Sequence, residues 1–82
     1  MKVRVEGWKR VDYVSNKTGK NVKGWNIYVT REPSVSESEY ITGKVCEDLY
    51  VPDTFDIKSV AIGFDFNVVY NRYGGVEEVQ AL

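Results

Sequence analysis

The sequence predicts an all-β fold. Apolar side chains recur mostly at every second position, which is the spacing of a strand with one buried face. Residues that favour strands are abundant, with two Trp, six Tyr and three Phe among 82 residues. Glycine, asparagine and proline divide these runs at short intervals, as turns do. A chain of this length and ordinary globular composition is expected to form one domain, residues 1–82.

The first strand is predicted to be long and bent. Val3 and Val5 alternate with charged residues, Gly7 interrupts the alternation, and Val11 and Tyr13 resume it. A glycine at such an interruption indicates a β-bulge or a bend within one continuous strand.

The second strand, expected at residues 24–31, follows a polar turn at residues 15–24. Alternation gives this strand two different faces. The apolar face carries Trp25, Ile27 and Val29. The other face carries Asn26, Tyr28 and Thr30. Tyr28 is therefore expected to face solvent.

The third strand is expected at residues 41–51, after an exposed acidic loop at 32–40. Cys46 is expected to be a small buried side chain of this strand. The segment that follows reads as a single helical turn, with Asp53 or Thr54 as its N-cap.

The last two strands form a second hairpin. Residues 61–71 read as a strand whose Phe64 and Phe66 are expected in the core, and residues 71–75 form a tight turn into residues 76–82. Five strands in this order, with a helical turn between the third and fourth, predict an OB-like five-stranded Greek-key barrel. An SH3-like barrel or an open meander is the alternative.

Composition excludes several kinds of chemistry. The chain has no histidine and one cysteine, which rules out zinc sites built on these residues and Ser–His or Cys–His catalysis. Asp53 and Asp56, with Asp65 further on, resemble a magnesium ligand set, but capping and solvation explain them as well. We expect no cofactor and no enzymatic activity. No run approaches the roughly 18 apolar residues of a membrane span, and no signal peptide is evident, so a cytoplasmic location is expected.

The charge of the chain is unevenly distributed. Residues 1–31 hold eight basic and two acidic side chains, whereas residues 32–82 hold three basic and ten acidic ones. Such an asymmetry indicates a basic binding face in the first half. Lysine and arginine neutralise phosphates, and exposed aromatic rings stack on unpaired bases. Because several of the aromatic residues lie in or beside the basic hairpin, the sequence predicts a surface for single-stranded nucleic acid.

Three features form the candidate site: the lysine-rich hairpin at residues 15–24, the aromatic residues beside it, and the turn at residues 72–75. The residues expected to contact phosphates are Arg4, Lys9, Arg10, Lys17, Lys20, Lys23 and Arg72. The residues expected to stack on bases are Tyr13, Trp25, Tyr28 and Tyr73. Tyr28 is the better stacking candidate, because packing in the core explains Trp25 equally well.

The hairpin Lys17-Thr18-Gly19-Lys20 and the late turn Arg72-Tyr73-Gly74 resemble those of the filamentous-phage gene V family of single-stranded DNA-binding proteins and their relatives in mobile elements. The similarity extends to chain length and strand order. It implies an OB-like fold, a two-fold homodimer and cooperative, sequence-tolerant binding of the kind that serves DNA replication. It also implies that the first hairpin is a DNA-binding wing, with Lys17, Lys20, Lys23 and either Trp25 or Tyr28 at the matching positions. Tyr73 would stack on bases.

We therefore expect a non-enzymatic homodimer that binds single-stranded DNA, with RNA as an alternative ligand. The acidic second half departs from the gene V family, notably at residues 32–39 and 77–78. It supports a second interpretation, a protein-interaction module in which Glu32–Asp53 meets a basic protein partner and the lysine hairpin is only solvated.

Overall fold

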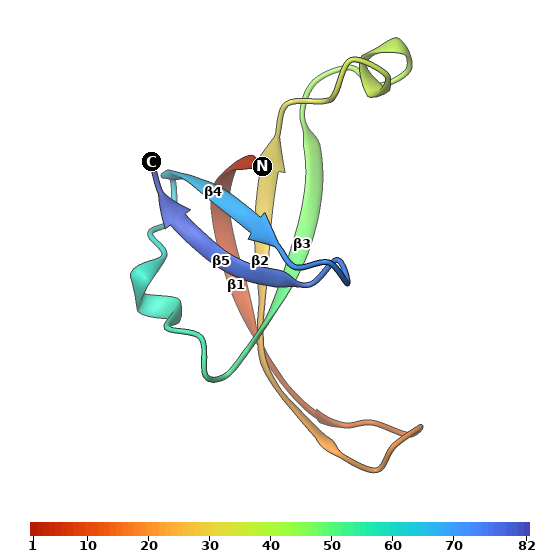
Figure 1. The fold of residues 1–82 in the computed structure, drawn as a ribbon, viewed down its shortest axis with the longest axis vertical. Coiled ribbons are helices and arrows are strands. Elements are labelled where there is room, and N and C mark those ends of the chain that lie inside the picture. Colours follow the sequence, from red (N-terminus) through yellow and green to blue (C-terminus); the bar gives the residue numbers. More distant parts are fainter.

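The computed structural model describes residues 1–82 as five antiparallel strands and two single 3-10 turns (Figure 1). The strands are β1 (Lys2–Val14), β2 (Asn21–Arg31), β3 (Val45–Pro52), β4 (Asp65–Tyr70) and β5 (Val76–Ala81). The turns are η1 (Glu37–Glu39) and η2 (Ile57–Ser59). The all-β prediction is confirmed, as is the helical turn between the third and fourth strands. The structure has no helix long and apolar enough to cross a bilayer.

All five strands belong to one sheet, in the order β3-β2-β1-β4-β5. β4 returns beside β1 after the β1–β2–β3 meander, which is a Greek-key connection. The short β4–β5 hairpin lies across the three longer strands (Figure 1). The edge strands β3 and β5 touch, but no hydrogen-bonded ladder joins them. Without this ladder the sheet is not closed, and the expected barrel is not confirmed. The β4–β5 hairpin crosses β3 instead of running along it (Figure 1).

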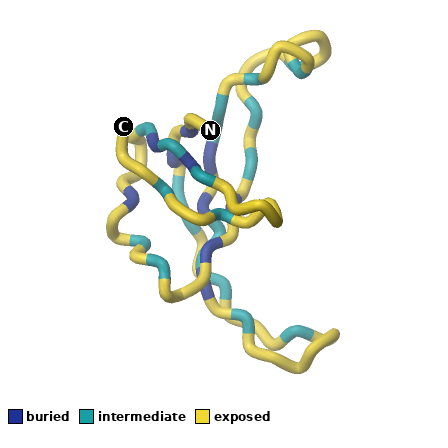
Figure 2. Tube along the Cα trace, viewed as in Figure 1, coloured by how far each residue is buried: buried dark blue, intermediate teal, exposed yellow.

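The core lies between the long strands and the β4–β5 hairpin. Its nine buried side chains are Val3, Val5, Ile27, Val29, Leu49, Val51, Val60, Phe66 and Val68. Burial of one such side chain contributes about 1.5–3 kcal/mol. This cluster therefore adds to the β1–β4 ladder in holding the β4–β5 hairpin against the three long strands. Figure 2 shows that buried positions gather where the two layers cross, while the far end of the β1–β2 hairpin is largely exposed.

A bulge in β1 decides which side chains leave the core. The β1–β2 register shifts between Val5 and Gly7, so the predicted irregularity at Gly7 is confirmed and is a bulge. One inserted residue reverses the alternation of the strand. Val5 is buried before the bulge, whereas Trp8 is the residue that packs against the core after it. Tyr13 consequently lies on the face opposite the core.

Two expected core residues are exposed. Cys46 faces solvent because Leu49 and Val51, with the opposite parity in β3, take the buried positions. Phe64 is 66% exposed because it precedes β4, directly after a turn at Gly63 with a positive φ of 86°. The expectations for Cys46 and Phe64 were therefore wrong.

The cap of η2 also differs from the prediction. The Asp56 carboxylate accepts a hydrogen bond from the backbone N–H of Lys58 at 3.2 Å. Asp53 and Thr54 lie too early in the chain, since the helical turn begins only at Ile57. The capping chemistry was predicted correctly, but the residue that supplies it was not.

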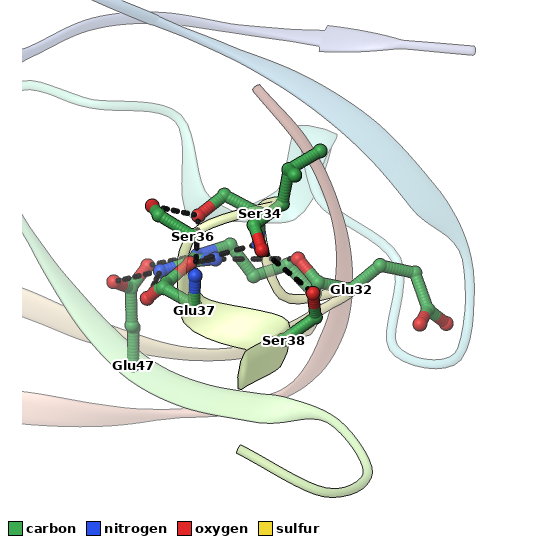
Figure 3. A network of polar contacts seen from close by, with 8 residues as sticks. Glu32, Ser34, Ser36, Glu37, Ser38 and Glu47 are labelled. Atoms are coloured by element: carbon green, nitrogen blue, oxygen red, sulfur yellow. Dashed lines mark hydrogen bonds and ion pairs between the residues drawn. The ribbon is translucent and has the colours of Figure 1, made fainter. Parts of the chain in front are cut away.

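The acidic loop between β2 and β3 is organised around Arg31. Figure 3 shows the side chains of this polar network, among them Ser34, Glu37 and Glu47. The Arg31 guanidinium donates to both Glu37 carboxylate oxygens, at 2.8 and 3.0 Å, and to both Glu47 oxygens, each at 3.2 Å. Its remaining N–H donates to the Glu32 carbonyl at 3.2 Å, so all five donors are used. Ser34 and Glu37 form a reciprocal capping box, in which each backbone N–H donates to the other side chain.

Acidification is expected to loosen this loop. Hydrogen bonds to the ionised carboxylate, first from Arg31 and then from Ser34, lower the pKa of Glu37 to about 2. A glutamate in an unfolded chain titrates near pH ~4.3. Because the folded pKa is the lower one, the network stabilises the loop fully above that pH and loses this contribution as the pH falls toward 2.

An NMR pH titration checks this expectation. The amide signal of Ser34, whose N–H donates to Glu37, should shift with a midpoint well below pH ~4.3, and Glu37→Gln should remove the shift. A Glu37 midpoint at the ordinary glutamate value would contradict the network.

Candidate nucleic-acid interface

The face of β1, β2 and β3 that points away from the core, called the outer face below, carries three exposed tyrosines. Tyr13, Tyr28 and Tyr50 are 56%, 41% and 45% exposed. The register places Lys9 opposite Asn26, and Asn26 opposite Tyr50. A cation, an amide and an aromatic ring therefore form one row across three strands. The expected solvent-facing position of Tyr28 is confirmed.

Tyr50 is held in place by its neighbours on β2. Its hydroxyl donates to the carbonyl oxygen of Lys23 at 3.0 Å. Its ring lies against Gly24, where an added Cβ would be 2.8 Å from Tyr50 Cε2 and 2.9 Å from the hydroxyl oxygen. Glycine is thus needed at this position to admit the ring. A ring fixed against backbone on one side and partly open to solvent is suited to stack on a base.

Tyr50 was not among the residues predicted from the sequence. The available signal was the alternation within β3, because buried Leu49 and Val51 place Tyr50 on the opposite face. Asp48 shares that face and lies opposite Tyr28, nearer the acidic loop.

A groove of about 300 Å³ opens on the outer face. Its lining residues come from all three long strands and are Val11, Tyr13, Val22, Asn26 and Tyr50. An adjoining depression is lined in part by Lys9. The groove therefore combines two aromatic walls and one carboxamide with a cation at its edge.

Three predicted site residues lie on the other face of the hairpin. Arg10 is opposite Trp25 in the register, and its guanidinium carbon is 4.8 Å from the centroid of the Trp25 ring. Arg10 also donates to the Gly24 carbonyl at 3.3 Å. Trp25 is half-buried and packs against the core. Lys23 shares the parity of Trp25 and lies opposite Asp12. These residues are not brought together with Tyr28.

The ion pairs of the protein lie at the end remote from the lysine hairpin. Arg4 donates to Asp65 at 3.2 Å, at the beginning of β1. The other pairs are Lys2–Asp65, Arg31–Glu37, Arg31–Glu47 and Lys44–Glu32. No ion pair involves Lys9, Lys17, Lys20 or Lys23. Positive charge is consequently left uncompensated at the hairpin end, where a polyanion would be attracted.

The residues Arg72 and Tyr73 occupy the separate β4–β5 turn. The Arg72 guanidinium carbon is 5.0 Å from the centroid of the Tyr73 ring, and Tyr73 is 81% exposed. The Asn71 side-chain oxygen accepts the N–H groups of Tyr73 and Gly75, at 2.9 and 3.0 Å, which fixes the turn. Figure 1 shows this tip apart from the tip of the β1–β2 hairpin.

The structure shows no group of three or more cysteine or acidic side chains arranged to hold a metal ion. No protein-family model, curated protein or solved structure matches the chain. The resemblance to the gene V family stays a prediction.

Proposed function

We propose that the protein is a non-enzymatic binder of single-stranded nucleic acid, with DNA as the preferred ligand. The observation that carries this proposal is the outer face, where three exposed tyrosines and Lys9 lie together on a surface that continues into the lysine hairpin. Bases would stack on Tyr50, Tyr13 and Tyr28, and Lys9, Lys17 and Lys20 would neutralise phosphates.

The distribution of charged side chains along the outer face would determine where the nucleic-acid strand binds. Asp48 and Glu6 lie toward the acidic loop, whereas the unpaired lysines lie toward the hairpin tip. Repulsion at one end and attraction at the other would favour the hairpin half of the outer face, with Tyr28, opposite Asp48, at the limit of the bound strand. Arg4, engaged with Asp65 at the far end, has no part in this arrangement.

Tyr73 would contact the same DNA strand as the outer face only in a dimer. Since it lies on a separate hairpin, it would join the same binding surface through a second copy of the chain, as the gene V resemblance implies. The edge strands β3 and β5 present unpaired backbone N–H and C=O groups, to which a strand of the second copy could hydrogen-bond.

Tyr50→Ala tests the proposal. Loss of one stacking ring should weaken binding of a labelled oligo-dT by about 1–3 kcal/mol, measured by fluorescence anisotropy. Tyr40→Ala is the matched control, because Tyr40 is 78% exposed but lies in the acidic loop. Its affinity should equal that of the unmodified protein. If both variants bind as the unmodified protein does, the outer face is not the site.

The second candidate function, docking of a basic protein on the acidic half, has less support. Glu37 and Glu47 are already bound to Arg31, and Glu32 lies 3.5 Å from Lys44. A basic partner would have to displace these internal cations.

A further inference from the structure

We infer that the groove between Tyr13 and Tyr50 is a slot for one unpaired nucleobase, whose Watson–Crick edge is bound by Asn26. This inference rests on the proposed function and extends it, because such a slot would give the protein its preference for single strands over duplex.

The lining of the groove fits a flat, mostly apolar ligand. Two tyrosines and two valines supply the apolar part, and Asn26 is the one polar residue. The groove has a volume of about 300 Å³, which lies at the small end of the range for small-molecule pockets. A pocket with apolar walls and a single hydrogen-bonding group orients a planar ligand by one edge.

Asn26 has an unused hydrogen-bonding group at the right place. It is half-buried in the middle strand, between Lys9 and Tyr50, and none of the side-chain hydrogen bonds of the protein involves it. The asparagines Asn67 and Asn71 in contrast are bonded to other protein groups, Asn67 to Gln80 at 3.3 Å. The carboxamide of Asn26 therefore offers a donor and an acceptor to a ligand in the groove.

A carboxamide in this place would recognise any unpaired base. Every base has a donor next to an acceptor on its Watson–Crick edge, and the amide can turn over to match either order. That edge is occupied in a duplex, so a paired base cannot use the slot. Lys9, next to Asn26 in the register, is placed to meet the phosphate of the inserted nucleotide.

The test uses oligo-dT and the same oligomer built from N3-methylthymidine, which keeps the ring but blocks its Watson–Crick edge. The unmodified protein should bind the methylated oligomer about 3–10-fold more weakly, the range of one net hydrogen bond. Asn26→Leu, of similar size, should bind the two oligomers equally and with an unchanged salt dependence, since no charge is removed. Thr30→Val, on the same face of β2, is the control and should retain the discrimination.

The outcomes separate the two proposals. If the protein does not bind oligo-dT at all, the proposed function fails and the slot with it. If it binds both oligomers equally before any substitution, the slot is overturned while the proposed function stands. The methylated oligomer tests the unmodified protein, so the result does not depend on the folding of Asn26→Leu.

Discussion

Replacing Gly24 with alanine is expected to lower the free energy of unfolding by about 1–3 kcal/mol, the usual cost of overfilling a packed site. The added Cβ would overlap the backbone carbonyl oxygen of Val51 and would lie 2.8 Å from the Tyr50 ring. The ring can turn away, but the carbonyl is part of β3 and can move only if the strands separate. The variant should also bind oligo-dT more weakly, because Tyr50 loses its support.

Gly7→Ala is the matched control. An added Cβ at Gly7 meets no atom within 4 Å. The free energy of unfolding of this variant should therefore stay the same or rise slightly, because alanine loses less backbone entropy on folding than glycine. Urea denaturation followed by tryptophan fluorescence compares the two variants. Equal free energies of unfolding for Gly24→Ala and Gly7→Ala would contradict the close approach of β3 to Gly24.

The double variant Lys17→Glu, Lys20→Glu is expected to bind oligo-dT at least about 25-fold more weakly in 0.1 M salt. Each phosphate contact contributes a slope of about −0.7 to log K against log salt, which corresponds to about fivefold per contact at this concentration. Loss of two contacts should also reduce the slope by about 1.4. The hairpin tip is exposed, so the fold should be unaffected.

The control for this variant must carry the same change in charge. Lys44→Glu with Lys58→Glu makes that change away from the hairpin, at two exposed positions. Its affinity should decrease only slightly. Similar losses in the two double variants would mean that net charge, not the hairpin, governs binding.

Local alternation was enough to predict much of the fold. The interruption at Gly7 indicated an irregularity in β1, which is the bulge. Alternation also assigned the two faces of β2 correctly: Ile27 and Val29 are buried, and Tyr28 is exposed. A serine followed three residues later by a glutamate, as in Ser34 and Glu37, is also the sequence signature of the capping box seen in the acidic loop.

Long-range geometry could not be predicted in the same way. The bulge changes the face on which Tyr13 lies. The register of β3 decides that Leu49 and Val51 are buried, while Cys46 and Tyr50 are exposed on the opposite face. The pairing of Arg10 with Trp25 depends on the register between two strands. Closure of a barrel depends on how the β4–β5 hairpin packs, which alternation along one strand does not specify.

The most direct test of the central claim is the anisotropy of fluorescently labelled oligo-dT at several salt concentrations. Labelled DNA is the better probe, because Trp8 and Trp25 are half-buried against the core. With Lys9, Lys17 and Lys20 in contact, log K should fall linearly with log salt, with a slope of about −2. The absence of binding, or binding that salt does not weaken, would contradict a surface built from these lysines and the tyrosines beside them.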